Sequence, residues 1–177
     1  MISYREYARL LGYPAGKPLE GDVRARAEDA IDWYRRNGKP RVTVRNLGDE
    51  AVAAITAGVE VEEEIAHLWA SDRVDEAYFL DRLAAGIVER LAVTVGDDLG
   101  AGDHRSPGYD GFPLEDQHVL FSWLAPLSPG IEILPSGMLK PKNSMLAVYP
   151  LRGEGRRSGS PCSRCGLTHC GFRGKAA

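Results

Sequence analysis

The hydrophobic positions of this chain recur at two different spacings, which predicts a mixture of helices and strands. Apolar residues three and four positions apart are typical of amphipathic helices, and they predict helices over residues 4–11, 22–36, 60–70 and 113–124. The longest stripe follows Ser71 or Asp72, either of which can cap a helix. This stripe consists of Val74, Ala77, Leu80, Ala84, Ile87, Val88 and Leu91. We expect this helix to lie at the centre of the core.

Strands are predicted where hydrophobic residues alternate with polar ones or form a short continuous run. Val42 and Val44 alternate with polar neighbours within residues 40–45, which is typical of a half-buried strand, whereas residues 51–57 read as a buried strand. Residues 131–134 and 144–148 are predicted as strands that flank a turn at 135–138. Because helices and strands are interspersed without a βαβ period, the predicted fold is α+β, with helices packed around a twisted, mainly antiparallel sheet.

The length of 177 residues allows one compact domain with a short appendage, and the composition excludes a disordered chain, a collagen and a disulfide scaffold. The net charge of −3 is unevenly divided, because residues 151–177 hold six Lys or Arg residues against one acid, a local charge of +5. Residues 1–150 carry a net charge of −8. All three cysteines also lie in the basic segment. We therefore expect a domain over residues 1–150 followed by a basic, Cys-rich tail over 151–177.

The segments near the N-terminus predict a cytoplasmic protein. Arg5 and Arg9 interrupt the apolar residues there, so no export signal is visible, and no apolar stretch reaches the roughly 18 residues of a membrane span. An odd number of cysteines in a reducing compartment argues against structural disulfides. It leaves metal or redox chemistry, or a dispensable tail.

A long loop is the first candidate for a functional site. Residues 96–113 are rich in glycine, proline and charged side chains, and a loop of this length is usually functional or disordered. Within it, Arg105, Ser106, Pro107, Gly108 and Tyr109 combine a fixed cation, a restricted backbone, a glycine that permits close approach and an aromatic plane. The set suits a ligand with a carboxylate and a flat ring. An ordinary Pro-Gly turn with an exposed arginine and a core-covering tyrosine explains the pattern equally well.

A second candidate is Glu89, near the C-terminal end of the central helix. The helix dipole disfavours a carboxylate there, so Glu89 is either simply exposed or held for a ligand. The sequence contains no Ser/His/Asp or Cys/His set that would indicate hydrolysis.

The segments SPGYDGFPLEDQHVLFSWL and PSGMLKPKNSMLAVYPL resemble the activation (reactivation) domain of cobalamin-dependent methionine synthase, in particular its free-standing small relatives. The resemblance extends back through AAITAGVEVEEEIAHLW and DEAYFLDRLAAGIVERLA and covers nearly all of residues 1–150. It implies an S-adenosylmethionine site at an Arg-x-x-x-Gly-Tyr-type loop. By motif these ligands are Arg105, the backbone around Ser106 and Pro107, Gly108 and Tyr109, with Glu89 assisting from the preceding helix. The segment between Asn46 and Ala51 is shorter than in those relatives, so an edge strand is expected to be missing or reduced.

What the resemblance implies is an accessory role in corrinoid reactivation, in which an oxidised cobalamin is rescued by one electron and a methyl group from S-adenosylmethionine. The cobalt-binding Asp-x-His-x-x-Gly motif is absent, so the corrinoid is expected on a partner, either a methionine synthase or another corrinoid protein. Flavodoxin or ferredoxin is the expected electron donor. The alternative from another class is a non-catalytic, metal-binding adaptor or regulator that retains the fold.

The cysteines of the tail are spaced as metal ligands. Cys162, Cys165 and Cys170 form a C-x2-C-x4-C pattern with His169 beside the last thiol. Zinc would use the three thiolates, with His169 available as a fourth ligand, whereas an iron–sulfur cluster would use the three thiolates. The activity implied by the resemblance favours the cluster, because zinc carries no electron. A nucleic-acid site is disfavoured, since Phe172 is the tail's single aromatic residue and the acidic domain repels phosphates.

Overall fold

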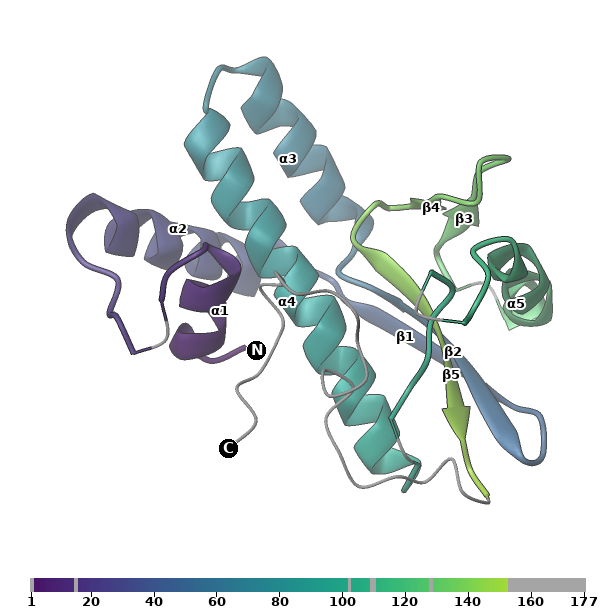
Figure 1. Ribbon diagram of the computed structural model, residues 1–177. Helices are drawn as coiled ribbons and strands as arrows, with labels where there is room; N and C mark the ends of the chain where they lie inside the picture. Colours follow the sequence, from purple (N-terminus) through teal and green to yellow (C-terminus); the bar gives the residue numbers. More distant parts are fainter. Residues whose placement is uncertain (1, 15, 102, 109–110, 128, 153–177) are drawn as a thin grey trace.

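The computed structural model describes residues 2–14, 16–101, 103–108, 111–127 and 129–152, which form an antiparallel sheet with helices on both faces (Figure 1). The helices are α1 (Tyr4–Leu10), α2 (Gly21–Asn37), α3 (Val59–Ala70), α4 (Val74–Asp98) and α5 (Asp116–Leu124), followed by a 3-10 turn at Ala125–Leu127. The strands are β1 (Arg41–Asn46), β2 (Glu50–Thr56), β3 (Glu132–Ile133), β4 (Leu139–Lys140) and β5 (Ser144–Pro150). The α+β prediction is confirmed. Within the described ranges, no helix has the length and apolar composition needed to cross a bilayer.

The central strand β2 explains the continuous run of small apolar residues in the sequence. It pairs with β1 on one side and with β5 on the other, both antiparallel. Alternate residues of a strand face opposite sides of the sheet. Ala51, Ala53 and Ile55 pack in the cluster formed with α1 to α4, whereas Val52 and Ala54 pack with α5. Every second position is therefore buried on one face and the remaining positions on the other.

Helix α4 is the longest helix and the centre of the larger core, as the sequence predicts, but its ends differ from the prediction. The helix begins after Arg73, and neither Ser71 nor Asp72 caps it, because Ser71 instead terminates α3. At the other end it continues to Asp98, because Ala92 and Val95 extend the buried stripe. The loop predicted to start at residue 96 consequently starts after residue 98.

The hairpin of β1 and β2 has a tight turn in the segment that the sequence marked as short. The Gly48 amide donates to Asn46 Oδ1 at 2.8 Å, and the Leu47 amide donates to the Glu50 carbonyl at 2.8 Å. Strand β1 is confirmed but lies at the sheet edge, where Val42 and Val44 remain 39% and 38% exposed. The prediction of a half-buried strand was wrong in this respect, because edge position is set by tertiary packing.

The last strands pair differently from the sequence prediction. β3 pairs with β4 in a separate two-stranded ribbon, and β5 belongs to the main sheet. Helix α5 begins at Asp116, three residues after the predicted Pro113, although its buried Leu120 and Leu124 pack against the sheet as expected. The ribbon and α5 lie together on the side of the sheet opposite α4 (Figure 1).

Candidate functional site

The loop after α4 is joined to the outer edge of β5 at one residue, Arg105. Its amide donates to the Val148 carbonyl at 3.0 Å, and the Val148 amide donates to the Arg105 carbonyl at 2.8 Å. These two bonds form a closed antiparallel pair, which fixes the backbone on both sides of Arg105. The loop therefore presents its side chains from a rigid sheet edge.

The pairing determines where the Arg105 guanidinium lies. Residues directly opposite each other in an antiparallel pair project to the same face, and Val148 packs in the α5 cluster. Accordingly, the Arg105 guanidinium carbon lies 5.7 Å from the centre of the Phe112 ring. One guanidinium nitrogen is 3.7 Å from Glu50 Oε1, and the two side chains are 61% and 50% exposed. Such an exposed ion pair is weak, so the cation remains available to an anionic ligand.

The residues on either side of Arg105 are buried. His104 and Ser106 are 4% and 5% exposed, and the His104 ring lies 5.7 Å from the ring of Tyr149, centre to centre. Burial lowers the pKa of His104 and outweighs the opposing influence of Asp103, so the imidazole is neutral at neutral pH. The Ser106 hydroxyl is buried and has no hydrogen-bond partner in the described part of the chain. An unsatisfied buried hydroxyl is costly, which makes it a candidate ligand contact.

The turn that follows uses glycine for a conformational reason. Gly108 has a φ of +90°, a region that residues with a Cβ rarely adopt, and its amide donates to the Phe112 carbonyl at 2.9 Å. Pro107 is buried. Tyr109 lies outside the described residues, so its predicted role stays a prediction.

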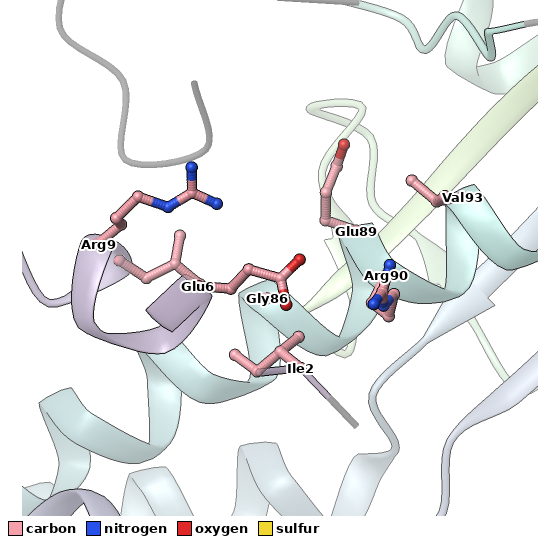
Figure 2. A pocket seen from close by; sticks show the side chains of 8 residues that line it. Ile2, Glu6, Arg9, Gly86, Glu89, Arg90 and Val93 are labelled. Atoms are coloured by element: carbon pink, nitrogen blue, oxygen red, sulfur yellow. The ribbon is translucent and has the colours of Figure 1, made fainter. Parts of the chain in front are cut away.

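Glu89 lies in a different place, in a hollow where α1 crosses α4 (Figure 2). Helix α4 packs on the face of the sheet opposite the one to which Arg105 points. The structure therefore does not bring Glu89 and Arg105 into one pocket. Burial raises the pKa of Glu89, and no described residue forms a hydrogen bond or ion pair with its carboxylate. The hollow is lined by Ile2, Glu6, Arg9, Leu10, Gly86, Glu89, Arg90 and Val93.

The predicted metal ligands Cys162, Cys165 and Cys170 lie outside the described residues. In the part of the chain that is described, no group of three or more His, Cys, Asp or Glu side chains could hold a metal ion. The metal site and its boundary with the domain stay predictions from spacing.

The arrangement of elements is similar to that of a solved structure, which defines the fold. It is the "Crystal Structure of the MetH Reactivation Domain bound to AdoHcy", with a TM-score of 0.64 over 89% of this chain and 75% of that chain. The chain has the fold of the MetH reactivation domain. The sequence identity is 13%, so the likeness shows the fold alone. No family model and no curated protein matches the sequence.

The loop differs from the pattern that the resemblance to the MetH reactivation domain implies, and His104 is the residue that sequence reasoning missed. That pattern has three residues between the arginine and Gly-Tyr, whereas two residues separate Arg105 from Gly108. The pattern puts its arginine four positions before the glycine, and this chain has His104 at that position. The spacing could have identified His104, and the structure adds that it is buried against Tyr149 while Arg105 faces the opposite side.

Proposed function

We propose that this chain binds S-adenosylmethionine at the loop of residues 105–109 and presents its methyl group to a corrinoid carried by a partner methionine synthase or related protein. One observation carries the proposal: a chain with the fold of the MetH reactivation domain holds an exposed arginine of an Arg-Ser-Pro-Gly-Tyr loop rigidly at the sheet edge. The solved relative contains AdoHcy, the demethylated product of S-adenosylmethionine.

The described residues suit this ligand in chemical terms. The Arg105 guanidinium can pair with the methionyl carboxylate, which would compete with the weak contact to Glu50. The Ser106 hydroxyl supplies an unused hydrogen-bonding group, and Gly108 permits close approach of the backbone. Tyr109 is included by motif. The proposal leaves Glu89 out of this contact set, because it belongs to α4 on the other side of the sheet.

In the proposed methyl transfer, the chain only has to position S-adenosylmethionine. A reduced corrinoid from the partner takes the methyl group from the sulfonium, which leaves AdoHcy, and a one-electron donor such as flavodoxin or ferredoxin supplies the reduction. The chain itself needs no nucleophile. Holding the sulfonium in one orientation lowers the entropic part of the barrier. A rigid loop paired to β5 is suited to that task.

Calorimetric titration of the protein with S-adenosylmethionine and with AdoHcy tests the proposal. Arg105→Ala removes the carboxylate contact, so we expect the dissociation constant to rise about tenfold or more. The matched control is Arg36→Ala, at an exposed arginine of α2. Wild-type protein that binds neither compound would contradict the proposal, and so would equal losses in the two variants.

The alternative is a non-catalytic adaptor or regulator that retains the fold. One observation favours it: the shortened spacing before Gly108, which places the neutral His104 where the resemblance implies an arginine. This alternative predicts a folded protein that binds the partner without binding S-adenosylmethionine. A pull-down with the corrinoid protein, combined with the titration above, distinguishes the two functions.

A further inference from the structure

The hollow between α1 and α4 carries two opposite charged groups that remain unsatisfied. Glu89 extends from α4 and Arg9 from α1, and both border the same hollow (Figure 2). Arg9 Nε is buried and donates to no acceptor among the described residues, and no described donor reaches Glu89. The two groups do not form an ion pair with each other. A buried donor without an acceptor is costly, and the half-buried carboxylate of Glu89 on the same hollow has no described partner either, which points to a ligand that contacts both.

The other charged residues of the hollow are already engaged or exposed. Burial raises the pKa of Glu6, but hydrogen bonds from the Ser3 hydroxyl and amide, with contributions from Arg90 and Arg9, outweigh it and leave the pKa below its usual value. Glu6 is therefore ionised and committed to capping α1, where it accepts from the Ser3 amide at 2.8 Å. Arg90 is exposed. The unsatisfied pair is thus Glu89 and Arg9.

Gly86 of α4 lines the hollow and lies against Ile2 and Leu10 from the N-terminal segment. A Cβ at this position would lie 2.6 Å from Leu10 Cδ1 and 2.8 Å from Ile2 Cδ1. The glycine lets the helices cross closely and places Glu89 and Arg9 around one space. That space is about 80 Å³. It is large enough for several water molecules, so the head group of a small ligand fits inside it.

We propose that this hollow binds the zwitterionic head group of an α-amino acid, with Glu89 accepting from the ammonium and Arg9 donating to the carboxylate. The ligand presents one cationic donor and one anionic acceptor on the same carbon atom, which complements the carboxylate of Glu89 and the guanidinium of Arg9 in charge. The hollow is open to solvent, so the amino-acid side chain points outward. This site is separate from the loop at Arg105 and does not depend on the function proposed there.

Amide NMR of the full-length protein, titrated with glycine and L-alanine, tests this site. We expect saturable shift changes confined to α1 and α4, with a dissociation constant on the order of 1 mM. Glu89→Gln and Arg9→Gln should each weaken binding about tenfold. The matched controls Glu63→Gln and Arg5→Gln alter exposed residues and should leave it unchanged. Arg9→Lys replaces Arg9→Gln should the latter fail to fold.

Three results would overturn the proposal. The first is the absence of saturable binding in the folded wild-type protein, and the second is equal binding by wild type and Glu89→Gln. The third is acetate or methylammonium binding as tightly as glycine, which would show that a single charge suffices. Arg105→Ala should leave glycine binding intact. If Glu89→Gln instead abolishes the binding of S-adenosylmethionine, the hollow belongs to that ligand's own site and the separate site is refuted.

Discussion

Replacing Asp81 by asparagine should destabilise the protein in a pH-dependent way. Asp81 lies on α4, is 8% exposed, and accepts hydrogen bonds from Asn143 Nδ2 at 3.1 Å and Lys142 Nζ at 2.7 Å, as well as from Arg82. These contacts connect α4 to the start of β5, the strand that holds the Arg105 loop. Burial raises the pKa of Asp81, but the three hydrogen bonds outweigh it, so the net pKa lies below the ordinary 3.8.

The size of the effect follows from these contacts. A hydrogen bond to a charged group contributes about 1.5–3 kcal/mol. The Lys142 and Arg82 side chains are 56% and 37% exposed, so solvent screening reduces the contribution of their hydrogen bonds to stability. We therefore expect Asp81→Asn to lower the free energy of unfolding by about 2 kcal/mol at neutral pH. The matched control Asp75→Asn, on the same helix, removes a 3.4 Å pair with Arg26 from a carboxylate that is 68% exposed. It should cost less than about 0.5 kcal/mol.

Urea unfolding at pH 7 and in acid measures the difference. Because the pKa of Asp81 is depressed in the folded state, its stabilisation is complete above the ordinary pKa of 3.8 and is lost as the pH falls through the folded-state value. The gap between wild type and Asp81→Asn should thus close in acid. A gap of the same size at both pH values would refute the electrostatic explanation and indicate a packing defect.

Two further predictions concern the backbone and the tail. Gly58 has a φ of +108° and a Cβ there would lie 2.8 Å from the Lys39 carbonyl oxygen, whereas Gly48 has a φ of +98° with no atom within 4 Å. Gly58→Ala should therefore lower Tm by roughly 2–4 °C for each kcal/mol of strain, and by more than Gly48→Ala; an equal effect would show that the Lys39 contact does not matter. Anaerobically purified protein should contain iron and labile sulfide, and Cys162→Ser with Cys165→Ser should abolish both. Stoichiometric zinc in a colourless protein would contradict the cluster.

The sequence predicts best the elements whose apolar residues follow the buried positions of the element without interruption. The run at 51–57 is continuous because β2 is buried on both faces, and the stripe of α4 is regular because one face of this helix contacts the core throughout. The two-residue strands β3 and β4 contain too few positions to show a period, so their pairing is not visible in the sequence.

The sequence predicts that the candidate site lies on a loop, but it does not predict which elements its side chains contact. The residue types of Arg105 and Gly108 suit a ligand-binding turn or an ordinary Pro-Gly turn, and the structure places Arg105 in a bridge to β5 and Gly108 at a positive φ in the turn that follows. Helical periodicity places Glu89 beside the core stripe but does not say which element it meets, and that element is α1. The pairing of Arg105 with Val148, which decides the direction of its side chain, is a contact between residues far apart in the sequence.

The exposed edge of β1 affects how the protein behaves in concentrated solution. Among the described residues the outer edge of β1 has no strand partner, and an edge of this kind with exposed Val42 and Val44 is a template for pairing with a second copy. In an antiparallel pair of two such edges centred on Thr43, Arg41 of each copy would lie opposite Arg45 of the other. Like charges directly opposite each other are unfavourable. The arginines of β1 therefore act against sheet-to-sheet aggregation, and high salt, which screens this repulsion, should promote it.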